Sequence, residues 1–174
     1  FPAARRGLPR RPALFVEWGM VLSKCYLVAA TYRSGSTLLC ETLAGAGLAG
    51  APKEFFHPLN MTPLAEQNYV AFIRQTIEET ATPNGVFGAK LLWHHVAYIC
   101  EHVRSFPEFQ MPGQSSRDIL SALFNGPYYI RVFRRDKLGQ AISYVKARQT
   151  GVFHHYRDKP NTPLRDPVFD AAAI

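Results

Sequence analysis

The sequence predicts an α/β protein in which helices flank a mainly parallel sheet, because strand-like and helix-like segments alternate along it. Three short apolar segments, residues 25–30 (CYLVAA), 86–92 and 128–133, each have the length of a strand. A helical pattern follows each of them, and this alternation is typical of a parallel sheet. The chain has 174 residues, which suits one domain or part of a larger one.

The helices have recognisable start and stop signals. Ser36 begins an apolar-periodic helix that is expected to end at Gly45 or Gly47. The pair TP at residues 62–63 supplies a cap and a first turn for a helix that runs to about Thr80. Three further helices are expected, over residues 94–104, 116–124 and 136–150.

Both ends of the chain depart from this pattern. Residues 1–19 contain three prolines and two arginine pairs without any period, which predicts an irregular basic extension or leader; a basic targeting arm is the alternative. The final residues, FDAAAI at 169–174, resemble the opening turn of a helix. A fold that ended there would have a short sheet. We therefore expect residues 20–174 to be the N-terminal portion of a domain that is truncated at its C-terminus.

Composition excludes several classes of protein. Hydrophobic residues make up 47% and charged residues 19%, so a sizeable core is available and wholesale disorder is excluded. No run of 18 apolar residues occurs, so we expect no membrane-spanning helix. The three cysteines, at 25, 40 and 100, have neither disulfide nor metal spacing, which favours reduced thiols in the cytoplasm. The adjacent histidine pairs are not a zinc pattern, so we expect no metal.

The net charge of +7 is concentrated in one segment. Residues 131–165 contain nine basic and two acidic side chains. Such a concentration suits an anionic ligand, although a solvated basic helix face would have the same composition. A nucleic-acid-binding protein is disfavoured, since no recognition motif or aromatic platform accompanies the charge.

The loop TYRSGST, residues 31–37, is the strongest local signal. It joins a strand to a helix, where a glycine turn and the free amides of the helix start can converge on one anion. It differs from the nucleotide-kinase loop, which requires a Lys before the Ser or Thr and an opening Gly. An anion cradle is therefore predicted at five residues, Arg33, Ser34, Gly35, Ser36 and Thr37.

A second signal lies in residues 130–150, where a strand ends in Arg134 and Arg135. Ligands of open parallel sheets bind at the carboxyl ends of the strands. Ser143 lies two turns into the following helix, and Lys146 one turn further. One or both arginines with Ser143 can bind a second phosphate, and an exposed basic helix start is the alternative.

Four segments together resemble the bacterial trehalose 2-sulfotransferase family: YLVAATYRSGSTLL, APKEFF, GVFGAKLLW and RRDKLGQAISYVKARQT. They occur in the same order between Cys25 and Val152. The resemblance implies a sulfotransferase with a fold like that of P-loop-containing nucleoside triphosphate hydrolases. It also implies 3′-phosphoadenosine 5′-phosphosulfate as the sulfuryl donor, no metal, and a domain that continues beyond Ile174.

The resemblance also implies roles for individual residues. Arg33 to Thr37 correspond to the loop that binds the 5′-phosphosulfate, with Arg33 stabilising charge on the leaving group. Arg134 and Ser143 match the 3′-phosphate positions. Arg135 competes with Arg134, because it has the eight-residue spacing to Ser143 seen in the wider superfamily.

The resemblance assigns the general base to Glu54, with His94 and His95 as alternatives. Lys90 either reaches the site or forms a structural salt bridge, and Trp93 either stacks on a ligand or packs in the core. The predicted acceptor-binding residues are Tyr32, Pro52, Lys53, Glu54, Phe55, Phe56 and His57.

Two departures from the family lie on the acceptor side. Tyr32 stands where trehalose-directed members tend to have a Gln that contacts the sugar, and Ala51 stands where they have an acidic residue. We therefore expect a carbohydrate or glycolipid hydroxyl as acceptor, without commitment to trehalose, and we keep a homodimer open. The alternative function is a non-catalytic module that binds adenosine 3′,5′-bisphosphate.

Overall fold

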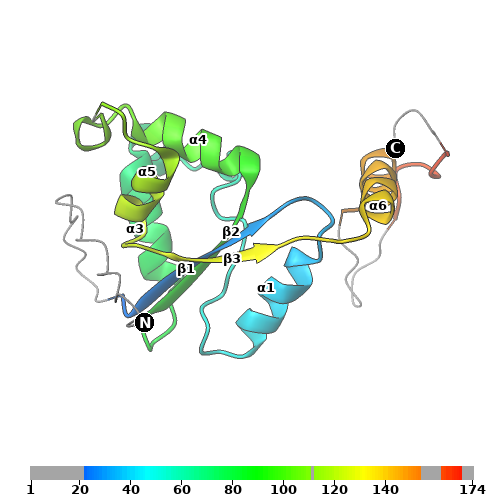
Figure 1. The fold of residues 1–174 in the computed structure, drawn as a ribbon, viewed down its shortest axis with the longest axis horizontal. Coiled ribbons are helices and arrows are strands. Elements are labelled where there is room, and N and C mark those ends of the chain that lie inside the picture. Colours follow the sequence, from blue (N-terminus) through cyan, green and yellow to red (C-terminus); the bar gives the residue numbers. More distant parts are fainter. Residues whose placement is uncertain (1–21, 111, 154–161, 170–174) are drawn as a thin grey trace, which may run out of the picture.

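A parallel sheet of three strands forms the centre of the molecule. The structure, a computed structural model, describes residues 22–110, 112–153 and 162–169 (Figure 1). Strands β1 (Lys24–Ala30), β2 (Val86–Leu92) and β3 (Tyr128–Val132) pair in the order β2-β1-β3, with both pairings parallel. The predicted α/β class and parallel sheet are confirmed, and the strand bounds agree within one residue.

The helices follow the strands in the expected order. They are α1 (Ser36–Gly45), α2 (Pro63–Gln67), α3 (Tyr69–Thr80), α4 (Trp93–Val103), α5 (Ser116–Leu123) and α6 (Lys137–Thr150). Two short 3-10 helices, η1 (Pro58–Asn60) and η2 (Pro107–Phe109), lie in the connections.

The sequence predicted one continuous helix to Thr80. This prediction was wrong in one respect, because Asn68 divides the segment into α2 and α3. The backbone of Asn68 is extended, with φ −151° and ψ 92°. Its side-chain oxygen accepts a hydrogen bond from the amide of Ala71 and so caps α3. Asn is a favoured N-cap residue, and here capping prevails over continuation of the helix.

Helices cover the two faces of the sheet unequally. Tyr26 and Val28 of β1 pack with Cys40 of α1 on one face. Alternate residues, such as Leu27, belong to a larger core on the other face with side chains of α3, α4 and α5. This division gives the central strand β1 a buried side chain on each face.

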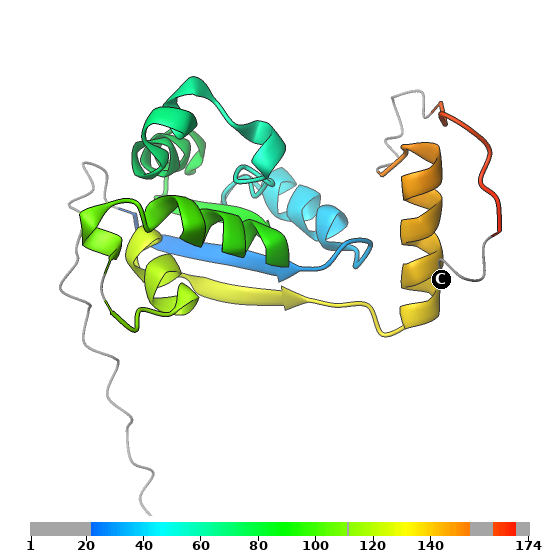
Figure 2. The same cartoon turned by 90° about the horizontal axis from the view of Figure 1, so that it is seen from above.

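Strand β3 forms an edge of the sheet, and its side chains are largely exposed. Tyr128 is 67% exposed and Tyr129 48%. The chain then leaves the sheet for α6, which stands beyond the carboxyl ends of the strands (Figure 2). The side-chain nitrogen Nε2 of Gln140 donates hydrogen bonds to Thr31 Oγ1 (2.9 Å) and Tyr32 O (2.6 Å). Helix α6 therefore adjoins the loop after β1.

None of the helices in the described ranges is long and apolar enough to cross a membrane. The predicted basic extension at residues 1–19 lies outside the residues that the structure describes.

Candidate active site

The loop between β1 and α1 lies at the carboxyl end of the central strand. Gly35 caps α1 with φ 90°, a left-handed conformation that glycine adopts without steric cost. A Cβ atom added at Gly35 would meet nothing within 4 Å. Conformation, not crowding, therefore requires glycine at this position, and open space lies beside the turn.

The hydroxyl groups of this loop face different surroundings. Ser34 Oγ is buried and has no hydrogen-bond partner among the described residues. Ser36 is buried at the start of α1. Thr37 Oγ1 accepts a 2.9 Å hydrogen bond from Lys90 Nζ. An unpartnered buried hydroxyl at a glycine turn is suited to receive a ligand oxygen.

Arg33 joins the loop to α6. Its Nε donates a 2.8 Å hydrogen bond to Ser143 Oγ, and its guanidinium also donates to the carbonyl oxygen of Phe153. The structure thus brings together two residues that the sequence assigned to separate anion sites.

A basic cavity of about 500 Å³ adjoins this contact. Arg134, Ser143 and Lys146 line it together with Arg33, whereas Arg135 is not among its lining residues. Arg134 also forms a 2.9 Å ion pair with Asp136, the residue that caps α6. Three cationic side chains around one cavity provide the charge that an anionic group requires.

Glu54 and Lys90 form an ion pair that reaches the loop. Lys90 Nζ lies 2.6 Å from Glu54 Oε1, and the same nitrogen donates to Thr37. The Lys90 side chain is 7% exposed and that of Glu54 24%. The carboxylate is therefore tied through one buried ammonium group to the first turn of α1. The two roles considered for Lys90, structural salt bridge and member of the site, are compatible here.

His95 lies beneath the same carboxylate. Its ring is fully buried, and its Nε2 lies 4.0 Å from Glu54 Oε2. The pKa of His95 is lowered from 6.5 to about 4, chiefly by burial and next by the neighbouring His94. The imidazole is therefore neutral at physiological pH.

His57, His94 and His95 form a cluster with ligand atoms within 4.8 Å of one another. In two of the rings the Nδ1 atom accepts a backbone hydrogen bond: His57 from Leu59 (3.0 Å) and His95 from Leu92 (3.3 Å). A neutral ring whose Nδ1 accepts must have its proton on Nε2. A histidine that binds a metal normally donates through its second nitrogen, so these two rings are in the wrong tautomer for a metal.

Aromatic rings line the side of the loop nearest this cluster. Tyr32 stacks on His94 at 5.5 Å between ring centroids and on Tyr144 at 5.4 Å. Its hydroxyl lies 3.2 Å from His94 Nε2. No signal in the sequence marks Tyr144, because only the placement of α6 brings it to Tyr32.

The other predicted acceptor residues are distributed between surface and core. Phe56 is buried in the hydrophobic core, and Phe55 packs partly against that core. Pro52 is buried and Lys53 exposed, while the carbonyl of Lys53 accepts a 2.9 Å hydrogen bond from the amide of Lys90. The sequence left two roles open for Trp93, packing in the core or stacking on a ligand. Its side chain is 82% exposed, so it does not pack in the core.

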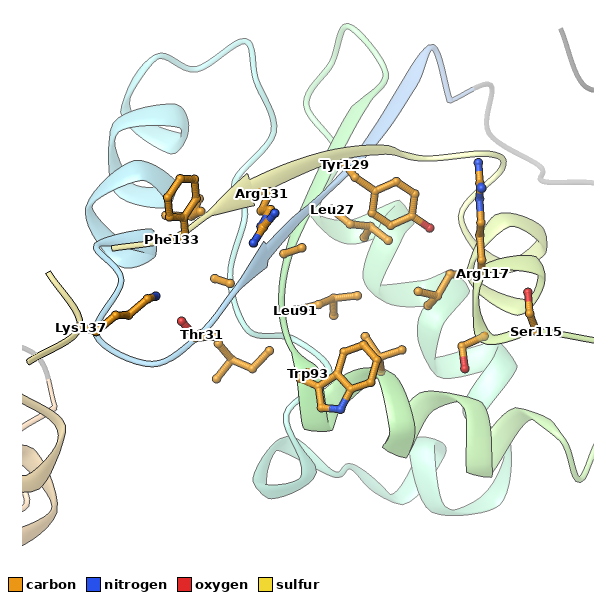
Figure 3. A pocket seen from close by; sticks show the side chains of 17 residues that line it. Leu27, Thr31, Leu91, Trp93, Ser115, Arg117, Tyr129, Arg131, Phe133 and Lys137 are labelled. Atoms are coloured by element: carbon orange, nitrogen blue, oxygen red, sulfur yellow. The ribbon is translucent and has the colours of Figure 1, made fainter. Parts of the chain in front are cut away.

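A larger apolar cavity, of about 770 Å³, lies over the sheet face between β3 and helices α4 and α5 (Figure 3). Leu91, Trp93 and Tyr129 are among its apolar lining, and Arg117 and Arg131 stand beside them. The sequence did not reveal this cavity, since its lining residues come from all three strands and from helices α4, α5 and α6.

The parallel sheet, the strand–loop–helix turn and the adjacent basic cavity define an α/β protein with cationic side chains gathered at the carboxyl edge of its sheet. A sequence model of the Stf0 sulphotransferase family matches residues 25–174. The chain belongs to this family.

Curated relatives agree with this assignment. The chain is 35% identical over 181 residues to trehalose 2-sulfotransferase from Mycobacterium tuberculosis (strain ATCC 35801 / TMC 107 / Erdman), an alignment that covers 86% of the chain and 65% of the relative. It is 33% identical over 178 residues to trehalose 2-sulfotransferase from Mycolicibacterium smegmatis, covering 85% and 62%. The resemblance to the trehalose 2-sulfotransferase family is confirmed, and the chain spans somewhat less than two thirds of these relatives.

Proposed function

We propose that the protein transfers a sulfuryl group from 3′-phosphoadenosine 5′-phosphosulfate to a hydroxyl of a carbohydrate or glycolipid. One observation carries this proposal: Lys90 contacts both Glu54 and Thr37, so a carboxylate and the anion cradle share one ammonium group. Sulfuryl transfer requires a base for the acceptor hydroxyl beside a site for the donor, and this arrangement provides both. Membership of the sulphotransferase family supports the same reaction.

The residues around the loop suit the proposed donor. The hydroxyl of Ser34 has no other partner among the described residues, and the space beside Gly35 is open to a phosphosulfate. Ser36, Thr37 and the free amides of α1 complete this 5′ site. The cavity beside Ser143 would take the 3′-phosphate. Its lining favours Arg134 over Arg135, and Arg33 would contact both ends of the donor.

In the proposed reaction the acceptor oxygen attacks sulfur as its proton passes to Glu54. The bond between sulfur and the bridging oxygen breaks, and adenosine 3′,5′-bisphosphate leaves. Negative charge grows on that oxygen, where the Arg33 guanidinium and the loop amides would stabilise it. No step uses a metal ion.

We assign the acceptor to the surface formed by Tyr32, His57 and His94 next to Glu54. Stacked rings beside hydrogen-bonding groups suit a sugar, which offers an apolar face and many hydroxyls. The curated relatives are named for trehalose, so a trehalose-like acceptor is our first candidate. We place the reaction in the cytoplasm, because the three cysteines are free thiols. We also propose that the domain has a P-loop-like fold and that it continues past residue 174.

Calorimetric titration tests the donor half of the proposal. We expect adenosine 3′,5′-bisphosphate to bind at least tenfold more tightly than 5′-AMP, which lacks the 3′-phosphate. Equal affinities in a folded sample would overturn the proposed 3′ site. Turnover with trehalose, glycolipids and phenols tests the acceptor half. Sulfation of phenols alone would overturn a carbohydrate acceptor, and bisphosphate binding without any turnover would favour the non-catalytic module.

A further inference from the structure

The buried ring of His95 has a donor without a partner. Its Nε2 is inaccessible to solvent and forms no hydrogen bond within the described part of the chain. Glu54 Oε2 lies 4.0 Å away, just beyond hydrogen-bonding distance. Burying an N–H group without an acceptor is costly, so such a group indicates a contact that forms in another state of the site.

The protonation of this ring follows from its other nitrogen. The amide of Leu92 donates to His95 Nδ1, which uses the lone pair of that atom. The neutral ring must therefore have its proton on Nε2 and can only donate there. It cannot accept a proton from an acceptor hydroxyl through Nε2, so the ring is suited to assist a base and not to be one.

The charged and titratable groups that face His95 keep it neutral. Burial disfavours the imidazolium, and His94, His57 and Lys90 act in the same direction. Glu54 alone among the facing groups favours the charged form. A neutral donor thus lies under one carboxylate oxygen while an ammonium group holds the other.

We propose that His95 is a positioning residue for Glu54, whose Oε2 accepts a hydrogen bond from His95 Nε2–H after a small movement of either side chain. This inference rests on the proposed function. With Lys90 on Oε1 and His95 on Oε2, each carboxylate oxygen keeps a further lone pair for the acceptor hydroxyl. A neutral second donor orients the carboxylate but lowers its proton affinity less than a second cation would, which suits a general base.

The first test needs no variant and no activity. Nitrogen-15 NMR of the histidine rings distinguishes the two neutral tautomers and the imidazolium. We expect His95 to show the Nε2–H tautomer from pH 8 down to about pH 5. An Nδ1–H tautomer, or protonation in the ordinary range near pH 6.5, would overturn the proposal.

The second test compares His95→Gln, which retains an N–H donor, with His95→Phe, which retains only the shape. Carbon-13 NMR follows the titration of the Glu54 carboxyl group, with Glu54→Gln for assignment and His102→Gln as the control, because His102 packs against Tyr69 and Tyr98 and not against His95. We expect the titration midpoint in His95→Phe to lie about one pH unit above that of the wild type, with His95→Gln closer to the wild type. If His95→Phe does not fold, the tautomer of His95 in the wild type and the titration of Glu54 in His95→Gln test the proposal instead. A midpoint in folded His95→Phe equal to that of the wild type would contradict the proposed contact.

Kinetics separate this inference from the proposed function. We expect kcat of His95→Phe to fall about tenfold at pH 7, with KM nearly unchanged. A higher KM with normal kcat would contradict a positioning role. If the wild type showed no turnover, the proposed function would fail, whereas the NMR titration would still test the contact between His95 and Glu54.

Discussion

Arg33 Nε donates a 2.8 Å hydrogen bond to Ser143 Oγ, across 110 positions of the chain. This contact joins the loop after the central strand to the second turn of α6. The resemblance to sulfotransferases assigned the two residues to opposite ends of the donor. Their contact joins the loop to the basic cavity that Arg33 also lines, which is why we propose one continuous site for both ends of the donor.

Arg33→Ala is expected to weaken binding of adenosine 3′,5′-bisphosphate by about 10- to 100-fold, because a hydrogen-bonded charge contact to each phosphate is lost. Calorimetry measures the change. Arg148→Ala is the matched control, since Arg148 is an exposed arginine of α6 that does not line the cavity. Equal losses in the two variants would indicate a general charge effect in place of a specific site.

Lys90→Met is expected to lower kcat by about 10- to 100-fold, since it removes the ammonium group that holds Glu54 beside Thr37. The bisphosphate affinity should change less than kcat. Steady-state kinetics and calorimetry on the same sample check both values. Lys24→Met serves as the control, because Lys24 is exposed and begins β1, at the end of the strand opposite the site.

Stability should fall as pH decreases from about 6.5 to 4. The pKa of His95 is lowered to about 4 in the folded chain. The unfolded chain binds a proton there at a higher pH than the native chain, so the native state loses up to about 3 kcal/mol over this window. Urea titrations at a series of pH values measure the slope. His95→Phe should reduce the slope and His102→Gln should retain it; an unchanged slope in folded His95→Phe would assign the effect to other groups.

Gly35→Ala is expected to destabilise the fold by about 1 kcal/mol, because residue 35 has φ 90°. Steric overlap should not contribute, since the added Cβ would lie in open space. Gly45→Ala is the control: Gly45 ends α1 without a positive φ and has equally open surroundings, so alanine there should be neutral or slightly stabilising. Thermal unfolding distinguishes the two. A stability loss in both variants would contradict the conformational explanation.

The apolar cavity over the sheet should bind an apolar fluorescent dye in the folded chain. Its lining includes Trp93 and Tyr129, both largely exposed. Tyr129→Lys should reduce dye binding severalfold. Leu38→Ser, at an exposed position of α1 outside the cavity, should leave dye binding unchanged. Equal dye binding by all three proteins would place the dye elsewhere.

Local sequence signals predicted most of the backbone, because strand length, helix caps and glycine stops act within a few residues. The strands over residues 86–92 and 128–133 needed nothing more than their apolar runs and flanking turns. The break at Asn68 was missed, since either a continuing helix or a capped restart satisfies the same residues locally.

The sequence by itself determined the fold class, the position of the strand–loop–helix turn at residues 31–37 where we propose an anion cradle, and the set of chemical groups available there. Tertiary structure decided which of these groups meet. Lys90 contacts Thr37 across 53 positions, and Tyr32 stacks on Tyr144 of α6. Such contacts depend on the pairing of parallel strands, which brings their carboxyl ends to one edge, and on the packing that directs each long side chain. Neither strand pairing nor side-chain packing can be predicted from a local pattern, because both form only when the whole chain folds.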